Sequence, residues 1–320
     1  MQSTQHSFYN SVTTTQLPER VTELSAEYDR LIGVRDEFVW RWIYSLLPSF
    51  RLPCVADSYH PVVREQKTIL TLFITLLDDV AEHDGDKATF EQARNVPFPH
   101  QTVDTSRSDV DTDTVKLAER LWTAFEAPLH DAPRGPEFLD VLRYDVRQAL
   151  NAMDYTWLVG NNPSAANLAE SYRYGTHNMI MYPYANVDLM HAPEFDRADL
   201  AALRETLGEL QRLAGIGNWV TTWEREIKEG DYSSGVVVAA LETGLFDPAE
   251  LPETPSEAEA KRYVEAIADH DMESRLESEW HERFEKLRAE TPDAESVDLD
   301  ALVEGMSTVF EYHQESRGMK

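Results

Sequence analysis

Three acidic side chains stand together at the end of the longest apolar run of the sequence. In the segment 76–82, Asp78 and Glu82 are four residues apart, and Asp79 follows Asp78 directly. On a helix, Asp78 and Glu82 would project from one face, whereas Asp79 would point about 100° away. Carboxylate oxygens presented together suit Mg²⁺, with phosphate oxygens and waters completing its octahedron. The segment therefore indicates a magnesium site, although a solvated helix end would carry the same residues.

A second polar pattern lies about 140 residues further along the chain. Asn218, Thr222 and Glu226 recur at every fourth residue, so on a helix they would line one stripe. Their amide oxygen, hydroxyl and carboxylate are hard oxygen donors, which suit a single Mg²⁺. The competing interpretation is a polar stripe that binds nothing. Taken as ligands, these three side chains predict a second metal-binding segment.

Both patterns fall in segments with the hydrophobic period of an α-helix. Apolar residues recur every three or four positions, and no segment alternates as a strand does. Residues 95–113 are rich in Pro, Ser and Asp, which predicts a surface loop. Gly175 and Pro183 interrupt 167–190, which predicts a broken helix. The predicted helical segments are 19–31, 35–47, 60–84, 112–129, 137–159, 167–190, 197–228, 234–245, 256–289 and 297–315.

Helix after helix with short connections predicts an all-α bundle. We expect the polar residues 1–17 to be a flexible N-terminal segment and 18–320 to form a single domain. The N-terminus lacks the cationic and apolar parts of a secretory signal, and the apolar run 69–77 is about half of a bilayer span. The single cysteine, Cys54, excludes an intrachain disulfide. These features predict a soluble cytoplasmic protein without stable membrane insertion.

The chain is strongly acidic. It has 58 Asp plus Glu against 29 Lys plus Arg, a formal net charge of −29. Nucleic acids and anionic membranes would be repelled, so we expect neither as a partner. A dense carboxylate surface stays soluble where salt screens it, which indicates a salt-adapted organism. An ordinary acidic protein is the alternative.

The two polar patterns resemble the metal motifs of class I terpene synthases of the bacterial and archaeal single-domain type. The segment 76–82 is similar to the aspartate-rich motif of that family. The segment 218–226 is similar to its second metal motif, in which a basic residue, here Arg225, precedes the Glu. Arg173 in the broken helix resembles the family's diphosphate-sensing arginine. Arg317 resembles the first member of its C-terminal Arg-Tyr pair, although the Tyr is missing.

This resemblance implies a class I terpenoid synthase-like bundle with a central active-site cavity. It implies three Mg²⁺ ions, with Mn²⁺ as a substitute, around the diphosphate of a prenyl diphosphate substrate. The implied reaction is ionisation and cyclisation or rearrangement of a linear C15 or C20 chain to a terpene, with release of diphosphate. The implied metal ligands are Asp78, Asp79, Glu82, Asn218, Thr222 and Glu226.

The resemblance also implies roles for other side chains. The implied diphosphate-binding residues are Arg173, Arg225 and Arg317. The implied catalytic residues at the helix break are Arg173, Thr176 and His177. Aromatic rings would line the cavity and stabilise a carbocation through their π faces. The candidates are Phe73, Tyr182, Trp219 and Trp223, and for each of them plain core packing is the alternative.

Four other functions compete with this one. A chain-elongating prenyltransferase would carry a second aspartate-rich motif, and a squalene or phytoene synthase would carry paired DxxxD motifs. A non-catalytic helical protein could bind an isoprenoid or a partner helix. The pair His270 and Asp271 is a weak sign of a metal phosphohydrolase, which would need further His ligands. A homodimer is the oligomeric state that we consider as an alternative to a monomer.

Overall fold

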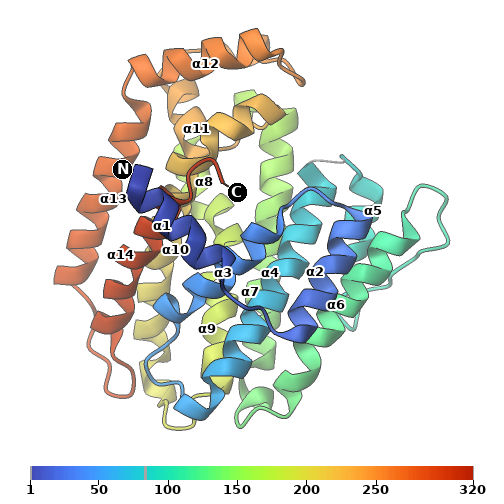
Figure 1. Ribbon diagram of the computed structural model, residues 1–320, viewed down its shortest axis with the longest axis vertical. Helices are drawn as coiled ribbons and strands as arrows, with labels where there is room; N and C mark the ends of the chain where they lie inside the picture. Colours follow the sequence, from blue (N-terminus) through green and yellow to red (C-terminus); the bar gives the residue numbers. More distant parts are fainter. Residues whose placement is uncertain (1, 83–84, 320) are drawn as a thin grey trace.

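Apolar residues at helical spacing direct one face of almost every segment into a common core. The computed structural model describes residues 2–82 and 85–319, and the side chains of 7–81 and 85–319 (Figure 1). The regular elements of this part of the chain are all helical, which confirms the all-α prediction. The α-helices are α1 (Gln2–Thr13), α2 (Glu19–Leu31), α3 (Glu37–Leu46), α4 (His60–Glu82), α5 (Lys87–Ala93), α6 (Thr112–His130), α7 (Gly135–Asn161), α8 (Leu168–Arg173), α9 (Met181–Met190), α10 (Leu200–Glu229), α11 (Gly235–Glu242), α12 (Glu257–Asp269), α13 (Met272–Ala289) and α14 (Leu299–Glu315).

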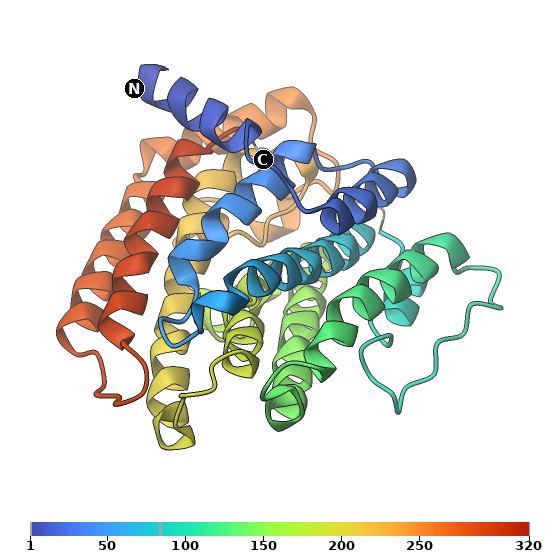
Figure 2. The same ribbon diagram turned by 60° about the horizontal axis from the view of Figure 1, so that its bottom comes forward.

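Three long helices, α4, α7 and α10, form the frame of the bundle (Figures 1 and 2). On α4, side chains such as Ile69, Leu70 and Phe73 have no exposed surface, because other helices cover almost every face of it. The 30-residue helix α10 ends at Gly230. The φ of Gly230 is 82°, a left-handed conformation that glycine adopts without strain, so the chain can turn away there.

The segment 167–190 is broken, as its glycine and proline predict. Helix α8 ends at Arg173, and a 3₁₀ helix, η4 (Gly175–Met179), separates it from α9. Ile180 joins η4 to α9 in a left-handed conformation, with a φ of 48°. The 3₁₀ helix packs on α7 and α10, and α9 packs on α4, α7 and α10. The broken segment therefore contacts both helices that carry the polar motifs.

Two parts of the chain differ from the prediction. Residues 2–13 form α1 where a frayed segment was expected, and Phe8 and Val12 are buried in the core. The single helix predicted over 256–289 is two helices. Asp271 separates α12 from α13 with a φ of 54°, which aspartate tolerates better than most residues. Helix α12 consequently crosses one end of the bundle, while α13 runs along α10 (Figure 1).

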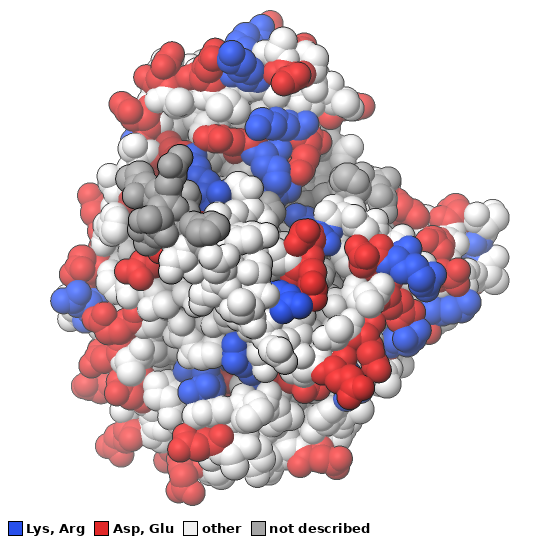
Figure 3. Space-filling view, viewed as in Figure 1, with Lys and Arg blue, Asp and Glu red and all other residues white. Residues whose placement is uncertain are grey.

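Charged side chains cover much of the surface. In Figure 3, acidic side chains are spread over all parts of the visible face, with Lys and Arg among them. Many form ion pairs one helical turn apart, such as that of Arg283 with Glu279. Among the described helices, none combines the length and the apolar character needed to cross a bilayer.

Close packing of α14 against the 3₁₀ helix η1 (Leu47–Phe50) requires a glycine at position 305. A β-carbon on Gly305 would lie 2.0 Å from the carbonyl oxygen of Ser49, so the two backbones would have to separate. Gly305→Ala is expected to lower the free energy of unfolding by about 1–3 kcal/mol, measured by urea denaturation. The control is Gly160→Ala in α7, where a β-carbon meets nothing within 4 Å. The control should raise stability by up to about 1 kcal/mol, and equal effects would contradict the close contact.

Candidate active site

The adjacent aspartates of the first motif have different environments. Asp79 is 1% exposed and accepts hydrogen bonds from the Tyr28 hydroxyl and from the Arg35 side chain, whose Nε lies 2.9 Å from Oδ1. Its carboxylate is therefore already held by two donors that come from α2 and the loop after it. Asp78 is partly exposed, and the nearest Arg35 nitrogen lies 4.0 Å from its Oδ2. The side chain of Glu82 lies outside the described residues.

One face of α4 is open to solvent. Between 66 and 81 every residue is buried except Thr71, Thr75 and Asp78, which are partly exposed. These three recur at helical spacing and form one stripe, here called the open stripe. Seven residues separate its ends, so it is about 10 Å long. Within the described residues, α4 therefore keeps one partly exposed face, and Asp78 of the first motif lies on it.

The three residues of the second motif share one stripe of α10, as their spacing predicts. The Thr222 hydroxyl donates a 2.9 Å hydrogen bond to the main-chain carbonyl of Asn218. Within the described residues, the side-chain amide of Asn218 makes no hydrogen bond. Oε2 of Glu226 is buried and likewise has no hydrogen-bond partner. The stripe thus presents an amide and a carboxylate oxygen that no described protein group satisfies.

Electrostatic coupling shows that the two motifs lie at the same end of the bundle. Burial and the neighbouring Asp79 raise the pKa of Asp78 to about 7, and the more distant Asp231 adds to this shift while Arg225 opposes it. Burial and Asp231 also raise the pKa of Glu226 to about 7. Asp231 follows the end of α10, and its main-chain N–H donates to the Glu226 carbonyl at 2.9 Å. Asp78, Glu226 and Asp231, together with Arg225, are here called the acidic mouth.

The acidic mouth and the stripe of α10 carry the types of oxygen donor that a hard divalent cation prefers. Glu226 offers a buried oxygen without a partner, and two of the carboxylates have pKa values near 7 in the absence of a cation. A divalent ion would compensate the negative charge that these carboxylates bring together. The donor set is carboxylate, amide and hydroxyl oxygen, which suits Mg²⁺ or Mn²⁺. Within the described part of the chain, no three Asp, Glu, His or Cys side chains converge as a metal group.

The three arginines of the sequence prediction have different partners. Arg225 lies in the acidic mouth, where Nη1 pairs with Glu229 at 2.6 Å and the buried Nε–H has no partner. Arg317 makes a two-pronged ion pair with Glu273, at 2.6 and 2.7 Å, and a third contact with Glu224 at 2.8 Å.

Arg173 is exposed at the end of α8 and pairs with nothing in the described part of the chain. Of the three arginines, only Arg225 therefore offers an unpartnered N–H near the carboxylates.

The helix break packs tightly on α10. Thr176 is buried, and a β-carbon on Gly215 would lie 2.7 Å from its γ-methyl carbon. Nδ1 of His177 lies 3.1 Å from Nε2 of Gln211, and burial lowers the pKa of His177. The break therefore contacts the same stripe of α10 that carries the second motif, one and two helical turns before Asn218.

The four aromatic wall candidates have packing partners. Phe73 packs on Trp122 of α6, with ring centroids 5.3 Å apart, and has no exposed surface. The Tyr182 hydroxyl donates to the Arg204 carbonyl at 3.0 Å.

Both tryptophans point toward elements beside α10. Trp219 packs on Tyr172 at 5.4 Å, and its ring fills the space where Gly235 lacks a side chain. The Trp223 indole N–H donates to Glu273 at 2.7 Å. Of the four candidates, Tyr182 alone is partly exposed, and the wall role of all four stays a prediction.

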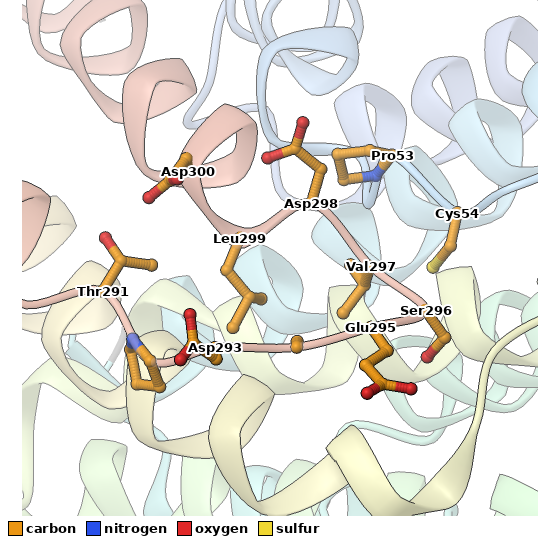
Figure 4. A pocket seen from close by; sticks show the side chains of 12 residues that line it. Pro53, Cys54, Thr291, Asp293, Glu295, Ser296, Val297, Asp298, Leu299 and Asp300 are labelled. Carbon is orange, nitrogen blue, oxygen red and sulfur yellow. The ribbon is translucent and has the colours of Figure 1, made fainter.

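Two surface pockets lie away from the motifs. One, of about 460 Å³, is formed by Pro53, Cys54 and the segment 291–300, and carboxylates surround it (Figure 4). The other, of about 830 Å³, lies mainly along α13 and includes Arg275 and Arg283. Neither is lined by a residue of the acidic mouth or of the open stripe.

Sequence reasoning missed three side chains of this region. Tyr28 and Arg35 precede the first motif by more than forty residues and belong to no recognisable pattern. Asp231 does carry a signal, because it follows the glycine that ends the helix of the second motif. A charged residue just past such a helix end stays close to its last turn.

A scan against models of known protein families finds no match, and a search of curated protein sequences finds none either. Solved structures do match over nearly the whole chain. Geranylgeranyl pyrophosphate synthetase from the archaeon Geoglobus acetivorans superposes with a TM-score of 0.54 at 14% identity, covering 97% of this chain and 99% of that one. 2-Methylisoborneol synthase from Streptomyces coelicolor, solved with Mg²⁺ and geranyl-S-thiolodiphosphate, gives 0.54 at 13% identity, covering 95% and 92%.

Farnesyl diphosphate synthase from T. brucei gives a TM-score of 0.50 at 14% identity, covering 96% of this chain and 95% of that one. The chain has the isoprenoid synthase fold. At such low identity the likeness establishes the fold alone, and the residues of this chain must carry any argument about its activity.

Proposed function

We propose that this protein is a magnesium-dependent class I terpene synthase. It would ionise a linear prenyl diphosphate, cyclise or rearrange the resulting carbocation and release diphosphate. The observation that carries this proposal is the buried, unpartnered Glu226 oxygen in the same acidic mouth as Asp78. Support also comes from the likeness to a synthase that was solved with Mg²⁺ and a geranyl diphosphate analogue.

Each residue of the acidic mouth has a distinct part in this proposal. Asp78 would hold metal ions from α4, while Asn218, Thr222 and Glu226 would hold one from α10. Bound Mg²⁺ supplies Lewis acidity that neutralises charge on the departing diphosphate. The Arg225 Nε–H is free to donate to a phosphate oxygen, a charge-assisted bond that strengthens as the C–O electron pair leaves with the diphosphate.

The surroundings of the acidic mouth would support that step. Arg35 and the Tyr28 hydroxyl hold Asp79 in place and so fix the last turn of α4, which orients Asp78. The partly exposed face of α4, which includes Asp78, Thr75 and Thr71, would lie against the hydrocarbon chain of the substrate. Enclosure there would keep water from the carbocation until it rearranges and loses a proton.

Another prenyl diphosphate enzyme of the same fold is the second candidate. The similarity to two prenyl diphosphate synthases favours this candidate, and that support rests on the shared fold alone. An elongating enzyme must position a second diphosphate. Against it stands the stripe of α10, which offers Asn218, Thr222 and a single carboxylate, Glu226, where a second aspartate-rich motif would place several.

The test uses the full chain in high salt with Mg²⁺ and geranyl, farnesyl or geranylgeranyl diphosphate. We expect diphosphate release and a cyclic or rearranged terpene, abolished by EDTA and restored by Mg²⁺ or Mn²⁺. Release only when isopentenyl diphosphate is added, with a longer linear product, would favour chain elongation. A folded protein that releases diphosphate from no substrate would contradict both enzyme proposals.

A further inference from the structure

The C-terminal turn of the chain is anchored to the helix of the second motif. The guanidinium of Arg317, just past the end of α14, contacts both carboxylate oxygens of Glu273 on α13 and one oxygen of Glu224 on α10. The Trp223 indole N–H donates to Oε2 of Glu273, which also accepts from Arg317. Two consecutive residues of α10 are therefore held by one group of contacts. Arg317, Glu273, Glu224 and Trp223 are here called the C-terminal clasp.

The clasp lies between two predicted metal ligands in the sequence but on another side of α10. Trp223 and Glu224 fall between Thr222 and Glu226. Glu224 is two residues from each of these ligands, which places it about 160° around the helix from both. Because a helix with its side chains is about 10 Å wide, Arg317 contacts α10 on the side opposite the metal-binding stripe. From that side it can fix the orientation of the stripe without touching an ion bound there.

The same C-terminal segment also contacts α10 at the start of the motif. A β-carbon on Gly217, the residue before Asn218, would lie 3.3 Å from Cδ2 of Phe310 on α14, so the two helices pack closely there. Gly217 and Glu224 are seven positions apart, and so are Phe310 and Arg317. The two segments therefore run side by side in the same direction along the motif, over about 10 Å (Figures 1 and 2). Their contacts bracket the motif at both ends.

Further contacts order the turn that carries Arg317. Nε2 of Gln314 donates to Glu277 at 2.9 Å, one helical turn along α13 from the clasp. Ser316 has no exposed surface, and its hydroxyl donates to the His313 carbonyl at 3.0 Å. Since the turn is already ordered, Arg317 loses little further freedom when it forms its bonds to the two carboxylates. The clasp is therefore suited to holding α10 in one orientation.

We propose that Arg317 and Glu273 are positioning residues of the proposed metal site. They hold the part of α10 between Thr222 and Glu226 in one orientation, so that the oxygens of the stripe face the same ion. Groups that orient metal ligands without touching the metal change its affinity by roughly 10- to 100-fold when they are lost. The inference rests on the proposed function. It gives Arg317 a role different from diphosphate binding, which the sequence resemblance implies for this residue.

Metal binding measures this role without turnover. Mn²⁺ is titrated into the full chain in the absence of diphosphate, and free Mn²⁺ is followed by its electron paramagnetic resonance signal. Arg317→Gln and Glu273→Gln should each weaken Mn²⁺ binding by roughly tenfold. The double variant should bind little more weakly than either single variant, because both changes break the same contact. Urea denaturation checks that each variant is folded.

Arg288 provides the matched control. Its guanidinium pairs with Glu285 of α13 at 3.3 Å and with Glu304 of α14 at 3.4 Å, so it joins the same two elements as the clasp. Both of these partners lie outside α10. Arg288→Gln should therefore leave Mn²⁺ affinity unchanged. An equal loss in this variant would show a general loosening of the helices and would contradict a positioning role.

A second titration separates positioning from diphosphate binding. Inorganic diphosphate is titrated calorimetrically into the wild type and each variant at saturating Mg²⁺. We expect equal diphosphate affinities, because excess metal compensates the weaker metal site and the clasp does not contact the anion. The inference stands only if both clasp variants lose Mn²⁺ affinity and neither loses diphosphate affinity. A loss of diphosphate affinity in Arg317→Gln alone would make Arg317 a diphosphate ligand and overturn it.

The outcomes also separate this inference from the proposed function. Weaker Mn²⁺ binding in both clasp variants, with no diphosphate release from any prenyl diphosphate by the wild type, would support the clasp and contradict the synthase. Diphosphate release by the wild type with unchanged Mn²⁺ affinity in both variants would contradict the clasp alone. If the wild type binds no Mn²⁺, both proposals fail.

Discussion

Replacing Glu226 with glutamine is expected to lower the rate of diphosphate release by about 100-fold or more. Glutamine keeps the shape of the side chain and one carbonyl oxygen but removes the negative charge. In the structure, Oε2 of Glu226 is buried and has no hydrogen-bond partner among the described residues, and in the proposed function it would bind Mg²⁺. Kinetics with saturating prenyl diphosphate and increasing Mg²⁺ should show both a lower maximal rate and a higher Mg²⁺ requirement.

The matched control is Glu205→Gln on the same helix. Glu205 is exposed on α10, well before the second motif, so its loss should leave release and Mg²⁺ dependence unchanged. Asp78→Asn should behave like the Glu226 variant, because Asp78 faces the same mouth from α4. If Glu226→Gln keeps wild-type activity while folded, the acidic mouth is not the catalytic site.

Replacing Lys67 with methionine is expected to lower the free energy of unfolding by about 3–5 kcal/mol. Methionine fills most of the volume of lysine but leaves the carboxylate of Asp188 buried without its cation. Oδ1 of Asp188 already has no hydrogen-bond partner, so nothing in the site compensates the loss. Burial lowers the pKa of Lys67 and raises that of Asp188, and the attraction between the two partners opposes both shifts. Urea denaturation of the wild type and the variant measures the difference.

The double variant Lys67→Met with Asp188→Asn provides the control. Asparagine can still accept the hydrogen bond from Leu52 but carries no charge, so most of the lost stability should return. The two substitutions should therefore be strongly non-additive. A double variant as unstable as the sum of the single changes would show that packing, and not the buried charge, dominates around the Lys67–Asp188 ion pair, whose Nζ and Oδ2 are 2.6 Å apart.

The spacing of residues within short segments was sufficient to predict most of the helices and which motif residues share one helix face. The every-fourth spacing of Asn218, Thr222 and Glu226 put them on one face of α10 because helical geometry depends only on nearby residues. The break in 167–190 followed from glycine and proline in the same local way. The prediction was wrong over 256–289, where one helix was expected and the structure has two. Asp271 adopts a left-handed conformation and divides one amphipathic run into α12 and α13.

The sequence by itself determined which side chains could bind a metal ion, and the tertiary structure decided which of them are free to do so. Asp78 and Asp79 are adjacent and chemically identical, yet Tyr28 and Arg35 donate hydrogen bonds to Asp79, whereas Arg35 approaches Asp78 only to 4.0 Å. Only the tertiary structure shows that Arg317 pairs with Glu273 of α13, and its role as a diphosphate ligand stays a prediction.

The contacts of the exposed face of α4 are likewise a tertiary property. Helix α9 brings the Tyr184 hydroxyl onto that of Thr71, which is more than a hundred residues away in the chain. Spacing along one helix fixes which face a side chain occupies. What meets that face depends on distant segments, whose approach is governed by the packing of the whole core.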